Sequence, residues 1–317
     1  MLYGTGKYRY ELVDGWAKLP EGWSLDSVPG LFVDSQDRVY VLNRGPHPVM
    51  VFDREGNLLT SLGEGFFTHP NGICVGPDGS VYATDEKNHT LSKFTPDGKL
   101  LMTLGNKDQP SDTGYVEVPK SGPAGDSTIE ELDERLAMIK RSGPPFDRPT
   151  DVALSSSGEI YVSDGFGIDH DEYKAKDARV HKFTPDGTLL FSWGEPGTAP
   201  GQFRIPHGIW VDRQERVWVC DPHNRRVQTF NAQGEFLSQL ADLGGQASSI
   251  CIDNEETVYV SEIRDEQGVS IFTIDGKRLA CWATVGQPHA IAVDSRGDLY
   301  IGETSGSRAV QKFARRD

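Results

Sequence analysis

The sequence has little positive charge, few cysteines and no long apolar run. Its 317 residues carry 32 Lys and Arg against 47 Asp and Glu, a formal net charge of −15. Because the basic residues are scattered, no nucleic-acid partner is expected. No run approaches the ~20 apolar residues of a membrane span, and the first residues lack the apolar core of a signal peptide. No membrane partner and a cytoplasmic location are therefore expected.

The composition is that of a soluble globular chain, with 37% hydrophobic and 25% charged residues. Its four cysteines, Cys74, Cys220, Cys251 and Cys281, lie far apart and form no Cys-x-x-Cys pair. This spacing excludes a thiolate-cluster site. Because each cysteine falls within or at the end of an apolar strand pattern, reduced and buried side chains are expected.

What the chain does contain is an internal repeat. A Phe precedes a Gly turn in successive copies, at Phe52, Phe94, Phe183, Phe230, Phe272 and Phe313. The intervals are 42, 89, 47, 42 and 41 residues, which match propeller blades except where an insertion doubles one gap. The residues that follow each Phe also recur, as in Phe94-Thr-Pro-Asp-Gly and Phe183-Thr-Pro-Asp-Gly, where the Gly supplies the positive φ of a hairpin turn.

This repeat predicts an all-β, six-bladed propeller in a single domain. The last copy ends without an outer strand, so the strand at 8–16 is expected to complete it and close the ring. Ser127 and Glu130 form a capping box that predicts one short helix inside the insertion. The expected units are blade 1 at 26–63, blade 2 at 69–105, the insertion at 106–147, blade 3 at 148–194, blade 4 at 203–241, blade 5 at 246–283 and blade 6 at 287–317.

One register of the aligned first strands predicts a ring at the channel entrance. It contains Pro29, Asn71, Thr150, His207, Ser248 and His289. Blades 2, 4 and 6 are roughly 120° apart, so Asn71, His207 and His289 can converge on the axis. Two imidazoles placed in this way can hold a divalent metal, zinc being the common case, and His69 is a substitute ligand. The alternative is a pair of neutral histidines hydrogen-bonded to water and to neighbouring strands.

A second register, after the second strands, carries cations that could bind a carboxylate on a small-molecule substrate. Its residues are Arg44, Lys87, Phe166, His223 and Arg264. The alternative is that each cation pairs with an acidic residue beside it. Arg44 precedes Gly45-Pro46 in a loop with a set conformation and is the better candidate.

Several strings carry a resemblance to a known family. They include Arg148-Pro-Thr-Asp-Val-Ala-Leu, Tyr161-Val-Ser-Asp-Gly and Ile205-Pro-His-Gly. The repeats look like NHL repeats, and the strings resemble the peptidyl-α-hydroxyglycine α-amidating lyase family over blades 1 to 4 and the start of blade 6. The resemblance implies a six-bladed propeller that splits a carbinolamide N–C bond into an amide and glyoxylate. It also implies a channel zinc on three His, together with an Arg and a Tyr.

By this resemblance, His207 and His289 match two zinc ligands, and Arg44 in Asn-Arg-Gly-Pro-His matches the family arginine. The chain also departs from the family at three positions. Asn71 stands for the third His, Phe166 stands for the Tyr and can only contact substrate, and Ala290 stands for the calcium ligand. No matching calcium site is therefore expected. His170, Tyr173 or His69 could replace a lost catalytic group.

The sequence leads to three functional hypotheses. The first is a metal-dependent lyase of the amidating-lyase type, acting on a small hydroxylated substrate that bears a carboxylate. The second is a lactonase-type, metal-dependent hydrolase, to which Asn71 points because such sites rely more on carboxylates and Asn. The third is a non-catalytic NHL propeller that serves as a binding scaffold, which the losses at Asn71 and Phe166 support.

Overall fold

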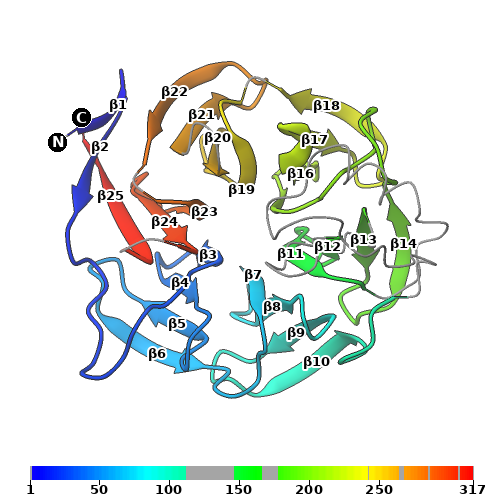
Figure 1. Cartoon of the computed structure of the whole chain (residues 1–317), viewed down its shortest axis with the longest axis horizontal. Helices are drawn as coiled ribbons and strands as arrows, with labels where there is room; N and C mark the ends of the chain where they lie inside the picture. The colour runs from blue at the N-terminus through cyan, green and yellow to red at the C-terminus, as the bar shows by residue number, and fades with distance from the viewer. Residues whose placement is uncertain are drawn as a thin grey trace, which may run out of the picture.

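Six antiparallel sheets stand around a central channel in the computed structural model, which confirms the predicted propeller (Figure 1). The structure describes residues 2–111, 146–165, 178–241, 243–263, 268–284, 286–305 and 308–316. In each sheet the strands follow chain order outward from the channel, apart from the sheet that closes the ring.

The first three blades each hold four strands. Blade 1 contains β3 (Gly30–Val33), β4 (Val39–Leu42), β5 (Val49–Phe52) and β6 (Leu58–Leu62). Blade 2 contains β7 (Pro70–Val75), β8 (Val81–Asp85), β9 (Thr90–Phe94) and β10 (Leu100–Gly105). Blade 3 contains β11 (Pro149–Leu154), β12 (Ile160–Asp164), β13 (Arg179–Phe183) and β14 (Leu189–Trp193).

The other blades repeat this plan. Blade 4 contains β15 (Ile209–Val211), β16 (Val217–Asp221), the short 3-10 helix η1 (Pro222–Asn224), β17 (Arg226–Phe230) and β18 (Phe236–Leu240). Blade 5 contains β19 (Gln246–Ile252), β20 (Thr257–Ile263), β21 (Gly268–Thr273) and β22 (Arg278–Ala283). Blade 6 contains β23 (Pro288–Val293), β24 (Leu299–Glu303), β25 (Val310–Arg316), β2 (Tyr8–Val13) and β1 (Leu2–Thr5).

The burial of each strand follows its place in the blade. Every residue of β12 and β16 is buried, because neighbouring blades cover both faces of a second strand. Outer strands face solvent, and β18 is exposed at every residue except Leu240. The tight turns are also as predicted: Gly187 has a φ of 89°, and its N–H donates to the Thr184 carbonyl at 2.9 Å.

The N-terminal strand closes the ring, as predicted from the incomplete last repeat. β2 pairs with β25 in the sheet order β1-β2-β25-β24-β23, and the two termini of the chain lie beside each other in Figure 1. A second connection reinforces this closure, because Arg54 in blade 1 pairs with Asp294 in blade 6 at 2.9 Å. The Arg54 carbonyl accepts bonds from Trp16 Nε1 and Lys312 Nζ.

Two sequence-based expectations have other outcomes. Cys74, Cys220 and Cys251 are buried free thiols, but Cys281 is exposed because it lies on the outer strand β22. The predicted helix at 127–140 lies outside the described residues. Within the described part of the chain, no helix has the length and the apolar character needed to span a membrane.

Candidate functional site in the central channel

The six residues of the predicted ring all line one cavity of about 610 Å³. Pro29, Asn71, Thr150, His207, Ser248 and His289 lie at one end of it. The other end reaches the turns after the first strands, at Asp34, Asp212 and Asp294. The ring therefore forms one end of a channel that runs the length of the first strands.

His207 and His289 lie beside each other in this ring. Their ring centroids are 4.8 Å apart, with an angle of 77° between the planes. Nδ1 of His207 donates to the Ser248 carbonyl at 2.7 Å, and Nδ1 of His289 donates to the Pro29 carbonyl at 2.9 Å. A carbonyl can only accept, so both protons are held on Nδ1 and both lone pairs on Nε2.

Burial keeps the two rings neutral. It lowers the pKa of His207 to about 4, against the opposing effects of the Ser248 hydrogen bond and the charge of Glu86. Burial also lowers the pKa of His289, to which the adjacent His207 and the charge of Arg44 contribute. A neutral imidazole with its tautomer set by a backbone carbonyl is the form that binds divalent metals.

Asn71 links the ring to Arg44. Arg44 Nη2 donates to Asn71 Oδ1 at 3.2 Å, and Arg44 Nε donates to the Pro70 carbonyl at 3.0 Å. Asn71 is 1% exposed, and its Nδ2 has no hydrogen-bond partner among the described residues. A buried amide donor without a partner costs about 1–3 kcal/mol, so this atom is suited to a ligand or water.

Glu86 joins Arg44 and His69 beside the ring. Nδ1 of His69 donates to Glu86 Oε1, and Arg44 Nη2 lies 3.8 Å from the same oxygen. Burial raises the pKa of Glu86, but the His69 hydrogen bond and the Arg44 charge outweigh it, and the net pKa lies below its usual value. Glu86 is therefore an ionised, buried carboxylate, and within the part of the chain that the structure describes its Oε2 has no hydrogen-bond partner.

The donor set partly matches the metal site that the family resemblance implies. His207 and His289 fit two ligands of a zinc-type ion, since both are neutral, adjacent and oriented by backbone carbonyls. Asn71 can add one oxygen. Among the described residues, His, Cys, Asp and Glu side chains form no group of three that could hold a metal. His69 is instead held by Glu86.

The other predicted site residues are dispersed or not described. Lys87 is exposed in the turn after β8. His223 lies in η1, where its carbonyl accepts a bond from Arg204 Nη1 at 3.1 Å. Phe166, His170, Tyr173 and Arg264 lie outside the described residues, so their proposed contacts with substrate stay predictions.

Comparison with known proteins supports the fold and the resemblance. The NHL repeat family matches residues 67–94. The chain is a six-bladed propeller that carries an NHL repeat. Human NHL repeat-containing protein 3 is 28% identical to it over 98% of this chain and 85% of that protein.

This NHL propeller is also similar to an enzyme. Peptidyl-alpha-hydroxyglycine alpha-amidating lyase 1 of Drosophila melanogaster is 27% identical over 82% of this chain, which spans 47% of the fly protein. Among solved structures, a gluconolactonase from Xanthomonas campestris superposes with a TM-score of 0.65. The two chains share 14% identity, with 92% of this chain and 87% of that one covered, so this likeness concerns the fold alone.

Glu86 is the residue that the sequence-based prediction of the site missed. It follows Asp85 at the end of β8 in the same way that Arg44 follows Asn43 after β4. Comparing the residue after each second strand would have placed Glu86 and Arg44 together. The charge pair between them is visible only because blades 1 and 2 are adjacent.

Proposed function

We propose that this NHL propeller is a metal-dependent lyase of the amidating-lyase type. Its substrate is a small hydroxylated compound with a carboxylate, cleaved at a carbinolamide-like C–N bond. The observation that carries the proposal is the neutral His207–His289 pair beside the arginine-bound Asn71. Similarity to the fly lyase points to the same reaction class.

In this proposal His207, His289 and Asn71 hold the metal. Such an ion, when bound, supplies Lewis-acid polarisation of a substrate oxygen. Arg44 binds the substrate carboxylate, because its Nε and Nη2 contacts to blade 2 hold the guanidinium in one orientation at the ring.

His69 is the proposed base in place of the family tyrosine. Glu86 holds its Nδ1 proton, so in the neutral ring Nε2 carries the lone pair that can accept the substrate hydroxyl proton. Loss of that proton makes the hydroxyl oxygen a carbonyl as the C–N bond breaks. The electron pair leaves with the amide nitrogen, which takes a proton, and the products are an amide and an α-oxo acid.

The first test is metal content together with activity. We expect purified wild-type protein to bind about one equivalent of zinc and to release glyoxylate from α-hydroxyhippurate. His207→Ala with His289→Ala should lose both, because only one donor of the proposed set remains. Lys99→Ala, a change at an exposed residue in the turn before β10, is the matched control and should retain both. A wild-type protein with neither metal nor glyoxylate release would argue strongly against the lyase.

Restoring the third ligand is a gain-of-affinity test. Asn71→His should raise zinc affinity by about tenfold or more, because it replaces a weak amide donor with a third imidazole in the same ring. The measurement is competition against a zinc chelator of known affinity. Thr150→His, in the same register but in blade 3, is the control. Equal gains in both variants would mean that Asn71 holds no special place in the metal site.

A lactonase-type hydrolase is the second candidate. The observation that favours it is Glu86, a buried carboxylate that Arg44 links to Asn71 and whose Oε2 has no hydrogen-bond partner among the described residues. Carboxylate and amide oxygens suit a harder divalent ion than zinc. Hydrolysis of lactones in a panel, lost in Glu86→Gln but not accompanied by glyoxylate release, would favour this function over the lyase. A ligand that stabilises the fold without turnover in either assay would favour the scaffold.

A further inference from the structure

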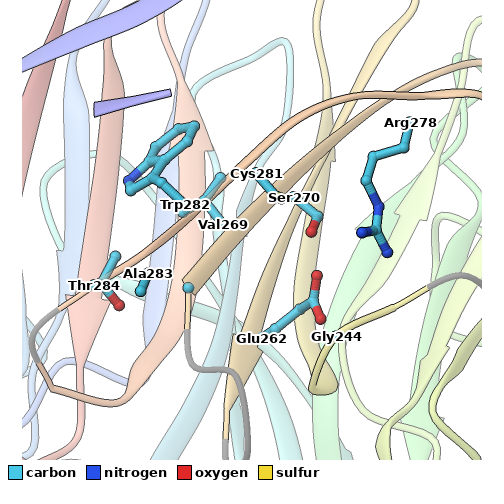
Figure 2. A pocket seen from close by; sticks show the side chains of 10 residues that line it. Gly244, Glu262, Val269, Ser270, Arg278, Cys281, Trp282, Ala283 and Thr284 are labelled. Atoms are coloured by element: carbon cyan, nitrogen blue, oxygen red, sulfur yellow. The ribbon is translucent and has the colours of Figure 1, made fainter. Parts of the chain in front are cut away.

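Blade 5 holds a second cavity, of about 380 Å³ (Figure 2). Its walls come from the end of β20, the start of β21 and both ends of β22, including Arg278 at its start, with Gly244 from the segment that leads into β19. None of the six ring residues is among the described residues that line it. The cavity is therefore separate from the channel site.

The equivalent space in blades 3 and 4 can be identified from a repeated hydrogen bond. Backbone N–H groups of Asp147 and Arg204 donate to the carboxylates of Asp164 and Asp221, at 2.9 and 3.1 Å. In blade 5 the N–H of Gly245 donates to Glu262 in the same way. The residues that immediately precede these three N–H donors therefore occupy the same position in their blades. They are Phe146 in blade 3, Phe203 in blade 4 and Gly244 in blade 5.

Both phenylalanines are fully buried and fill the space that Gly244 leaves open. Each is 0% exposed. Phe146 packs edge-on against His181, and Phe203 packs against Phe230, with ring centroids 5.2 and 5.6 Å apart. The absence of a side chain at Gly244 therefore removes an entire aromatic ring from blade 5.

Strand pairing shows that blade 5 also lacks large side chains at two further positions. The residue paired with the middle of the second strand is His181 in blade 3, Gln228 in blade 4 and Ser270 in blade 5. The residue paired with the carboxylate itself is Arg179, Arg226 and Gly268, respectively. Three neighbouring positions that hold large side chains in blades 3 and 4 are thus all small in blade 5, and their combined effect is the cavity.

The same changes remove the charge partner of Glu262. In blade 3, His181 Nε2 lies 3.3 Å from Asp164, and in blade 4, Arg226 Nε lies 3.0 Å from Asp221. Ser270 and Gly268 cannot reach Glu262 in that way. Glu262 is 2% exposed, and no ion pair joins it to a basic side chain in the described part of the chain.

Such an arrangement is costly unless something occupies it. A buried carboxylate loses solvation that one backbone N–H does not replace, and an empty cavity forfeits the packing that blades 3 and 4 retain. The Glu262 carboxylate and the Ser270 hydroxyl face the open space in Figure 2, and the Arg278 guanidinium, which has an interaction partner of its own, lies across from them. Both oxygen groups accept hydrogen bonds from an ammonium group.

We propose that the blade 5 cavity binds a small molecule with a primary ammonium group on a short aliphatic chain. The ammonium group pairs with Glu262 and hydrogen-bonds to Ser270, in place of the basic side chain that blades 3 and 4 supply. The aliphatic part lies against Cys281 and Ala283, which pair with Ser270 and Gly268 and therefore share their face of the sheet. This site does not depend on the channel chemistry proposed above.

The test measures binding of n-butylamine to the full-length protein at pH 7.5 by calorimetry and by thermal melting. We expect saturable binding and a rise in melting temperature, with no effect of n-butanol, which has the same chain without the charge. Glu262→Gln should weaken binding at least tenfold, since the amide oxygen still accepts from Gly245 but carries no charge.

The matched control is Ser270→His, which copies blade 3 by filling the cavity and giving Glu262 a partner. It should abolish amine binding and raise the melting temperature of the ligand-free protein. Should it misfold, Ser270→Gln copies blade 4 and serves the same purpose. Absence of amine binding to wild type, or equal binding to wild type, Glu262→Gln and the filled variant, overturns the proposal.

Discussion

A variant that lacks residues 1–16 should not fold into a closed ring. It loses β2, so β25 has no outer partner and blade 6 is left with an open edge. It also loses the buried rings of Tyr8, Tyr10 and Trp16, which are at most 5% exposed. Losing a buried aromatic side chain costs about 3–5 kcal/mol, and the sum approaches the whole stability of a typical domain, about 5–15 kcal/mol.

The experiment compares this deletion with the removal of residues 1–6 alone. The shorter deletion removes β1, which pairs only with β2 at the rim and whose Leu2 is 58% exposed. Circular dichroism melting should show a cooperative transition for the shorter deletion and none for the longer one. A longer deletion that melts like the wild type would mean that blade 6 is stable without its outer strand.

Acid should destabilise the protein through His207. Its pKa is about 4 in the fold because of burial, against about 6.5 in an unfolded chain. Between these values the unfolded state binds more protons, so this contribution to stability is complete above pH 6.5 and is lost as the pH falls toward 4. At pH 4.5 the loss from this one residue is about 2–3 kcal/mol.

The contribution of His207 has to be measured as the difference in unfolding free energy between wild type and a His207 variant, because other titrating groups change the stability in the opposite direction. Burial raises the pKa values of Asp151 and Glu303 to about 7, so the folded state gains stability as these carboxylates protonate. His207→Asn keeps a donor for the Ser248 carbonyl and removes the titration. Urea unfolding of metal-free protein at pH 7.5 and 4.5 should show the variant gaining about 2–3 kcal/mol on wild type at the lower pH. Parallel curves for the two proteins would rule out this role for His207.

Most of the fold could be predicted because a propeller repeats its local signals. Each Phe that precedes a turn, such as Phe183 at the end of β13, lies in a third strand, and the Gly that follows adopts the positive φ that the turn needs. The missing outer strand of the last copy predicted the pairing of β2 with β25. A repeat supplies its own alignment, so even this contact between the two ends of the chain could be inferred.

Less of the channel site could be predicted. The register that places His207 and His289 in one ring follows from strand counting. The contacts of Arg44 with Asn71 and Glu86 do not, because they depend on how two adjacent blades pack and on which rotamers fit between them. Glu86 carries no local motif, and its role as the partner of His69 appears only when the side chains are in place.

The blade 5 cavity likewise combines residues that can be recognised in the sequence with an arrangement that only the tertiary structure shows. Gly244, Gly268 and Ser270 are visible in the sequence as small residues, but Gly244 lies 24 positions before Gly268 and outside β21, the strand that holds the other two. Only strand pairing brings them to one wall with Glu262. Together these small residues leave a cavity, and the volume of a cavity depends on how the surrounding side chains pack.

By itself, the sequence determined the number of blades, the strand that closes them and the ring in which two histidines meet, because these follow from periodicity. The tertiary structure decided which of those groups are charged, which side chains hold them and where space remains open. Those properties depend on burial and on contacts between blades, and no single repeat contains either.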